Sequence, residues 1–144
     1  MTATASSLAS ASPLKASRPI KKGKIIITID LRAQKLWVDK YTKHRAVRLE
    51  ANTLPVVKES IHSGRFHPTK CKTHFRTVNG NTYLENVIFF DRAHAIRTSR
   101  DFQAFRKSGR PTTGQIVLEA DFGQILYETV QDYGPQQTEI RIRD

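Results

Sequence analysis

The sequence predicts a mainly β domain, a β-sandwich or barrel-like fold with one helix in the C-terminal half of the chain. Two observations support this fold class. About eight short segments carry β-branched or alternating apolar residues. One segment near the end of the chain has the apolar spacing of an amphipathic helix. The length of 144 residues fits a single domain with its own hydrophobic core.

The first half of the chain predicts a strand-rich region that begins near Lys24. The apolar run KIIITID predicts a buried strand, and the alternating QKLWVDK predicts its hairpin partner. Pro55 places the start of a later strand at a sheet edge or a strand beginning, because proline cannot donate to the ladder. A loop built around Gly64 and Pro68 is expected at 62–75. We expect strands at 24–30, 34–40, 44–50 and 54–61.

The second half predicts two further strands joined by a tight turn. The Asn79–Asn81 segment, Asn-Gly-Asn, is a strong turn signal between strands at 73–78 and 82–90. Residues 91–111 are polar and basic, and long connections of this kind are often functional. Short strands are expected at 115–118 and 138–143.

The predicted helix covers residues 119–135. Asp121 is the expected N-cap, and Gly134 with Pro135 is the expected stop. Apolar or small residues recur at helical spacing and define one face: Phe122, Ile125, Leu126, Thr129 and Val130.

The N-terminal segment differs in composition from the rest. Residues 1–23 are rich in Ser, Ala and Thr, basic, and free of acidic residues, so we expect a disordered tail before the folded domain at 24–144. An organellar transit peptide or a non-classical secretion signal is the alternative interpretation. The segment lacks the continuous apolar region of a classical signal peptide, and no run approaches the roughly 20 apolar residues of a membrane span. The compartment therefore stays open.

The charge of the chain points to anionic partners. A formal net charge of +11 favours nucleic acid, anionic lipid or an acidic cell-wall polymer, although a basic domain without a polyanion partner is equally compatible. The single cysteine, Cys71, allows no internal disulfide. Since there is no CxxC pair and no HExxH motif, we expect no metal site, and we expect no cofactor.

The order of the segments resembles the catalytic domain of YkuD-type L,D-transpeptidases over most of residues 24–142. IIITIDLRAQKLWV is similar to the opening hairpin of that family, and IHSGRFHPTKCKTHF to its Ser/Thr-Gly turn and Thr-Pro-x-Gly-x-Phe segment. VIFFDRAHAI is similar to the strand with the first active-site histidine, which puts His94 at that position. GRPTTGQIVLEADFGQILYETV is similar to the family signature and its following helix.

The signature departs from the family pattern at the positions that carry chemistry. The pattern reads Ser or Thr, His, Gly, Cys, an apolar residue, and Arg or Asn. Thr112 and Gly114 match it. Thr113 stands in place of the second histidine, Gln115 in place of the nucleophilic cysteine, and Val117 in place of Arg or Asn.

The reaction that the resemblance implies is acyl transfer between peptidoglycan stem peptides through a cysteine thiolate. The amide of Gln115 cannot form a thioester, and losing the nucleophile of a catalytic triad typically costs about 10⁶ in turnover. We therefore expect no catalytic residue in this domain, with residual activity as a lesser alternative. That alternative needs the hydroxyl of Thr112 or Thr113 with His94 as base, or Cys71 as a surrogate nucleophile. The simpler interpretation gives His94 and Cys71 structural roles.

The resemblance favours a catalytically inactive, pseudoenzyme-type binding or scaffold module. Peptidoglycan or another anionic or protein partner would then meet basic residues beside the old cleft, of which we single out Arg92, Arg97 and Arg110. The family works in the cell envelope, so the resemblance implies that location. The alternative is a nucleic-acid-binding module, because Phe102 and Phe105 lie among arginines.

Overall fold

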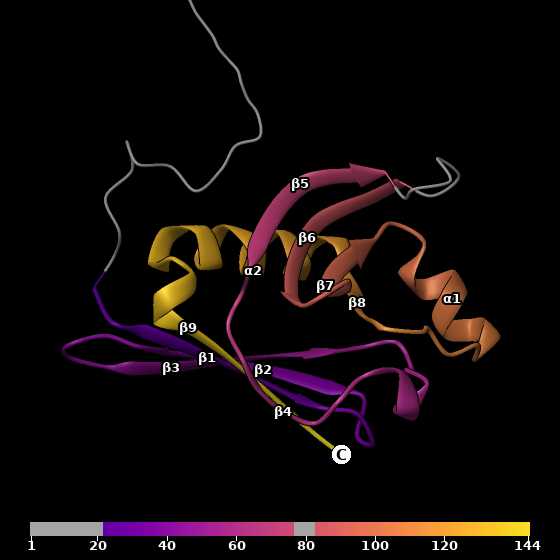
Figure 1. Ribbon diagram of the computed structural model, residues 1–144, viewed down its shortest axis with the longest axis horizontal. Coiled ribbons are helices and arrows are strands. Elements are labelled where there is room, and N and C mark those ends of the chain that lie inside the picture. The colour runs from indigo at the N-terminus through magenta and orange to yellow at the C-terminus, as the bar shows by residue number, and fades with distance from the viewer. Residues whose placement is uncertain (1–21, 77–82) are drawn as a thin grey trace, which may run out of the picture.

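Two β-sheets form the frame of the computed structural model, which describes residues 22–76 and 83–144 (Figure 1). The five-stranded sheet has the order β3-β2-β1-β9-β4, and the four-stranded sheet has the order β5-β6-β7-β8. The strands are β1 (Lys24–Asp30), β2 (Lys35–Tyr41), β3 (Ala46–Asn52), β4 (Gly64–Phe66), β5 (Lys70–Arg76), β6 (Tyr83–Asp91), β7 (His94–Ser99), β8 (Gln115–Glu119) and β9 (Thr138–Arg143). The mainly β prediction is confirmed. The proposed tail, apart from Lys22 and Gly23, and the proposed Asn79–Asn81 turn lie outside the described residues.

The opening hairpin is confirmed. β1 and β2 pair antiparallel from Lys24 opposite Tyr41 to Asp30 opposite Lys35. Alternate side chains of both strands, including Ile27 and Val38, are buried in the main core, as the period-2 pattern requires. β3 pairs antiparallel with β2, and β9 pairs parallel with β1, so the two ends of the folded chain share one sheet.

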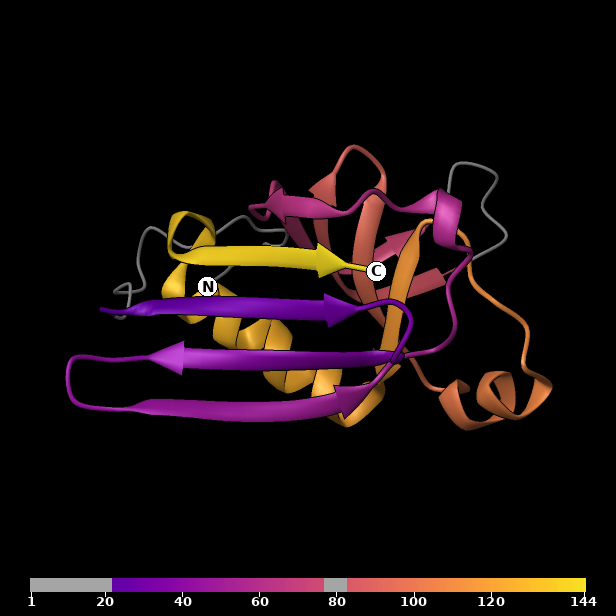
Figure 2. The ribbon, with the colours of Figure 1, turned by 90° about the horizontal axis from the view of Figure 1, so that it is seen from below.

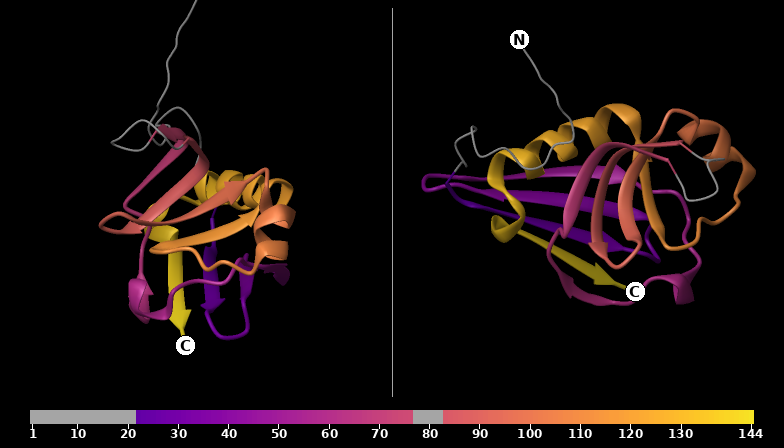
Figure 3. Two further views of the ribbon diagram at one scale, coloured as in Figure 1. Left: turned by 90° about the vertical axis from the view of Figure 1, so that its right-hand side faces the viewer. Right: turned by 45° about the horizontal axis from the view of Figure 1, so that its top comes forward.

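The predicted helix is α2 (Ala120–Tyr133), and it lies on the same face of the five-stranded sheet as the four-stranded sheet (Figures 2 and 3). Leu126 and Val130 are buried against both sheets, whereas Ile125 of the predicted apolar face is 51% exposed. The helix ends at Gly134, as expected. The prediction of Asp121 as N-cap was wrong, because α2 begins at Ala120, directly after β8. Asp121 instead lies in the first turn, where its carboxylate complements the helix dipole.

The predicted connection at 91–111 contains regular structure that the sequence analysis missed. β7 occupies its first part, and a second helix, α1 (Phe102–Ser108), follows and ends at Gly109 with φ 71°. β7 itself contains one charged residue, Arg97, but the charged residues before and after the strand concealed its buried Ala95, Ile96 and Thr98. α1 projects from one side of the molecule, with Phe102 as its buried contact (Figure 1).

The predicted strand at 54–61 was wrong. Only Val56 forms a bridge, with Thr112, and a short 3-10 helix η1 (Lys58–Ser60) follows. The prediction allowed Pro55 at a sheet edge or a strand beginning, but its missing N–H removes a ladder donor, and no strand forms there. The predicted loop at 62–75 was wrong in part, since it contains β4 and the start of β5. A second 3-10 helix, η2 (Pro135–Gln137), leads into β9. No helix within the described residues is long and apolar enough to cross a membrane.

Candidate functional site

The segment before β8 is a turn held by hydrogen bonds to residues 55–60. The Thr112 backbone N–H donates to the Pro55 carbonyl at 2.8 Å. The Thr112 hydroxyl donates to the carbonyl of Gln115 at 2.8 Å and so closes the turn. The Gly114 N–H donates to the Ser60 hydroxyl at 2.8 Å, and Gly114 has φ 73°, a conformation that favours glycine. Thr112 and Gly114 therefore shape the start of β8.

Within residues 22–76 and 83–144, the side chain of Gln115 hydrogen-bonds to one other side chain, that of Arg97. β7 and β8 are parallel, with Ala95 opposite Gln115 and Arg97 opposite Val117. The Arg97 side chain turns back so that its Nε donates to Gln115 Oε1 at 2.5 Å, and its Nη1 donates to the Thr98 carbonyl at 3.2 Å. Both residues were singled out from the sequence, but the hydrogen bond between them was not predicted.

Arg97 is a half-buried cation without an acidic partner among residues 22–76 and 83–144. No carboxylate oxygen of that part of the chain lies within ion-pair distance of its guanidinium. Burial lowers the pKa of Arg97, because desolvation disfavours the charged form. A guanidinium stays protonated in proteins even so. The site thus holds a desolvated positive charge that two neutral acceptors stabilise.

His94 shares no described hydrogen bond with this pair. Its Nδ1 is 3.4 Å from the Asp91 carboxylate, an ion-pair distance, but the Nδ1 atom is buried and makes no hydrogen bond. A Cβ on Gly114 would lie 3.3 Å from the His94 ring. Because side chains alternate along a strand, His94 and Arg97, three residues apart, point to opposite faces of β7. The described hydrogen bonds bring Arg97, and not His94, to the Gln115 side chain.

The remaining site residues are dispersed. Val117 is fully buried against Leu54 and Phe102, so this position contributes to packing. Thr113 is exposed in the turn. Arg92 has φ 55° in the exposed turn between β6 and β7, and Arg110 is exposed after α1. The described hydrogen bonds of Arg97 go to Gln115 and Thr98 and involve neither of these arginines.

Cys71 is half-buried at the edge of the main core. Burial raises the pKa of its thiol to about 12, because the apolar surroundings disfavour the thiolate. At neutral pH this thiol is protonated and a poor nucleophile. No group of three or more His, Cys, Asp and Glu side chains in the described ranges could hold a metal ion.

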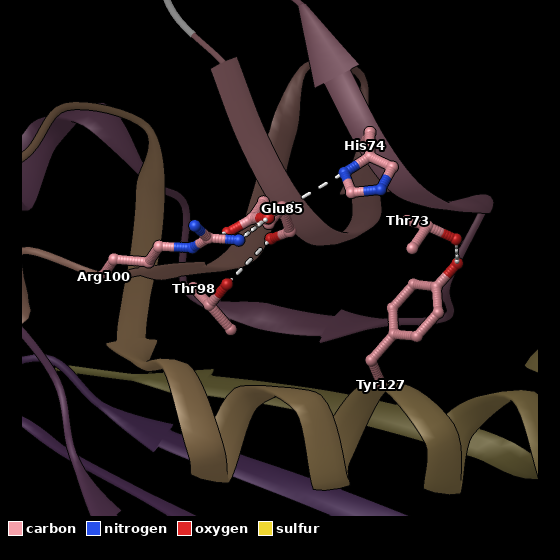
Figure 4. Close-up of polar contacts among 6 residues, drawn as sticks. All are labelled: Thr73, His74, Glu85, Thr98, Arg100 and Tyr127. Atoms are coloured by element: carbon pink, nitrogen blue, oxygen red, sulfur yellow. Dashed lines mark hydrogen bonds and ion pairs between the residues drawn. The ribbon is translucent and has the colours of Figure 1, made fainter.

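A polar cluster on β6 and β7 was missed by the sequence analysis. Figure 4 shows Glu85 of β6 between Arg100 and His74. Arg100 donates to both Glu85 carboxylate oxygens, at 2.9 and 2.8 Å, and His74 Nδ1 is 3.9 Å from the same carboxylate. The Thr98 hydroxyl donates to the Glu85 carbonyl at 3.1 Å. The sequence carries one signal for this cluster, an acidic residue inside the apolar run at 83–91.

Comparison with known proteins identifies the fold. No protein-family model and no curated protein matches the sequence. Among solved structures, an L,D-transpeptidase from Stackebrandtia nassauensis superposes with a TM-score of 0.68 at 16% identity, covering 88% of this chain and 58% of that one. An L,D-transpeptidase from Mycobacterium smegmatis gives 0.65 at 10% identity, covering 85% and 59%. An L,D-transpeptidase from Xylanimonas cellulosilytica gives 0.57 at 14% identity, covering 88% and 63%.

The chain thus spans about three fifths of the length of these structural neighbours. At this low sequence identity, the TM-scores show a shared architecture alone. The chain therefore has the fold of the YkuD-type L,D-transpeptidases.

Proposed function

We propose that this domain is a pseudoenzyme that binds an anionic ligand beside Gln115 and does not carry out thioester-based acyl transfer. The observation that carries the proposal is the half-buried Arg97, which has no acidic partner in the described residues and hydrogen-bonds to Gln115. The structural neighbours are named L,D-transpeptidases, which supports peptidoglycan as the ligand.

The chemistry of Arg97 favours a carboxylate ligand. A buried charge is costly unless it is paired, and neutral acceptors compensate that cost only in part. A guanidinium presents its donors as a planar fork that fits a carboxylate in bidentate fashion. Nε and Nη1 already donate to Gln115 and Thr98, and Nη2 has no hydrogen bond within the described chain. A ligand carboxylate would neutralise the charge and use the remaining donors.

Four observations argue against residual acyl transfer. Gln115 offers no nucleophilic atom comparable to a thiolate. The Thr112 hydroxyl is engaged with the Gln115 carbonyl, so it is not presented to a base. Cys71 is kept protonated by burial and packs at the edge of the core. Thr113 is exposed, and no described hydrogen bond joins it to His94.

Arg92 and Arg110 would attract the ligand from a distance but contribute little to its affinity. Both are exposed, so their charges are screened at physiological salt. Charges at the rim of a site mainly raise the association rate, whereas a desolvated charge contributes more to affinity. We therefore assign the affinity for the ligand to Arg97 and long-range attraction to the exposed arginines.

The nucleic-acid alternative loses one of its two aromatic residues. Phe102 is 3% exposed and packs with Leu54 and Val117, so it cannot stack on a base. Phe105 is 47% exposed and remains available. A steep decrease of oligonucleotide affinity with salt would support this alternative, and no binding at low salt would remove it.

Co-sedimentation with intact peptidoglycan sacculi tests the proposal. We expect the wild-type protein to sediment with sacculi at low and near-physiological salt. Arg97→Ala should weaken binding at least about tenfold, the range for a lost charge-assisted hydrogen-bonded pair. Lys43→Ala, which removes one exposed charge from the β2–β3 turn, is the matched control. Equal binding by the Arg97 variant and the wild type, with both folded by circular dichroism, would overturn the proposal.

A further inference from the structure

A hollow of about 230 Å³ lies beside Arg97, between β6, the end of β7 and the start of α1. Four of its seven lining residues are charged. The lining residues are Tyr83, Glu85, Arg97, Thr98, Ser99, Arg100 and Asp101. A ligand for this hollow is selected by the charges that remain after the lining residues have paired with one another.

Glu85 and Arg100 neutralise each other (Figure 4). Two short hydrogen bonds, at 2.9 and 2.8 Å, join the guanidinium to both carboxylate oxygens. The backbone carbonyl of Glu85 also accepts a hydrogen bond from Thr98, which fixes the residue on the sheet. This ion pair therefore adds no net charge to the lining of the hollow, and two other charged lining residues remain.

The first remaining charge is the guanidinium of Arg97, and the second is the carboxylate of Asp101. Asp101 occupies the N-cap position of α1, yet its side chain makes no capping hydrogen bond. Its carboxylate has no ion pair within the described ranges, although its backbone N–H is bonded to the Ser99 hydroxyl at 3.1 Å. The hollow thus presents one unpaired cation and one unpaired anion.

We propose that the hollow binds a small zwitterion of the amino-acid class, with its carboxylate on Arg97 and its ammonium on Asp101. The proposal rests on the anion-binding role given to Arg97 above and adds the second, acidic half of the site. Tyr83, which is 52% exposed, lines the same hollow, and its ring stacks on His74 with the centroids 5.3 Å apart. A ligand with only one charge would leave one of the two protein charges unpaired.

Three small probes test the contribution of each ligand charge, the carboxylate and the ammonium, on its own. Alanine carries both, N-acetylalanine keeps only the carboxylate, and alaninamide keeps only the ammonium at pH 6.5, below the usual pKa of an α-amino group at about 8. Titration of each probe into the full chain, followed by protein NMR shifts, should give a millimolar dissociation constant for alanine. Removal of either ligand charge should weaken binding roughly tenfold or more. No binding of alanine, or equal binding of all three probes, would overturn the inference.

Charge-removing variants assign each contact. In Asp101→Asn, alanine and N-acetylalanine should bind equally, because the acceptor for the ammonium is lost. In Arg97→Gln, alanine and alaninamide should bind equally. Asp121→Asn, which removes a carboxylate from α2, should leave the wild-type selectivity intact. Undiminished preference for alanine in Asp101→Asn would refute the assignment.

This result is independent of the sacculus experiment. If Arg97→Ala loses sacculus binding while the probes show no charge selectivity, the proposed function stands and the zwitterion site falls. If alanine binds selectively but sacculi do not sediment with the protein, the hollow is a small-molecule site and the peptidoglycan proposal falls.

Discussion

Replacing Gln115 by cysteine tests the arrangement of the site most sharply, because it places a titratable group beside Arg97. The Gln115 Oε1 atom accepts from Arg97 Nε at 2.5 Å. A cysteine sulfur lies closer to its own backbone than a glutamine oxygen, so we place the thiolate about 5 Å from the guanidinium charge. The change is best made in a Cys71→Ala background, which leaves one thiol in the chain.

The magnitude follows from Coulomb's law. Two unit charges about 5 Å apart interact by about 3 kcal/mol at an effective dielectric constant of 20. That energy corresponds to a decrease of about two in the thiol pKa from its usual value near 8.5. The site is half-buried, and desolvation opposes the decrease. We therefore expect the new thiol to titrate between about 6.5 and 7.5, the range that the two effects bracket.

The assay is the rate of alkylation by iodoacetamide as a function of pH. The midpoint of the rate profile reports the thiol pKa. Adding Arg97→Ala should return the midpoint to about 8.5 or above, because desolvation remains and the stabilising charge is gone. A midpoint that does not change on removal of Arg97 would refute the proximity of the two side chains and, with it, the geometry that carries the proposed function.

Three further predictions concern packing and the buried thiol. Gly123→Ala should lower the free energy of unfolding by about 1–2 kcal/mol in urea denaturation, because the new Cβ would clash with the Thr98 methyl and this overpacking outweighs the gain in helix propensity. Equal or greater stability of the variant would contradict the close packing of α2 on β7. Thr112→Ala should cost about 1 kcal/mol in the same assay through loss of the hydrogen bond to Gln115, and an unchanged midpoint would show that the turn does not need this bond. Cys71 should resist alkylation in the native state at pH 8, and fast alkylation of the native protein would contradict its burial. The free energy of unfolding should fall as the pH rises from about 9 toward 12, because the thiol ionises at a lower pH in the unfolded chain than in the folded protein.

The sequence predicted the elements whose side chains follow a clean period. The β1–β2 hairpin and β9 alternate apolar residues toward one core, and α2 carries an apolar stripe ended by Gly134. These patterns arise from burial on one face, which is a local property of the chain. They were sufficient for the fold class.

The sequence could not predict contacts that depend on pairing between distant strands. The sequence pattern around β7 is that of a basic connection. In the structure β7 pairs with β6 on one side and β8 on the other, and this pairing buries Ala95 and Ile96. The bond between Arg97 and Gln115 likewise depends on the parallel register of β7 and β8. Resemblance indicated His94 as the partner of the signature. The His94 ring does lie beside Gly114, but Arg97 is the residue that hydrogen-bonds to the Gln115 side chain.

The central claim is that the site binds a stem peptide without forming a covalent bond to it. Mass spectrometry of the intact protein with a peptidoglycan stem tetrapeptide, under native and then denaturing conditions, tests that claim directly. The account predicts a complex of protein and peptide in the native spectrum that dissociates completely on denaturation and leaves the peptide mass unchanged. A covalent adduct that survives denaturation would contradict the absence of acyl transfer, and no complex at all would contradict the binding role.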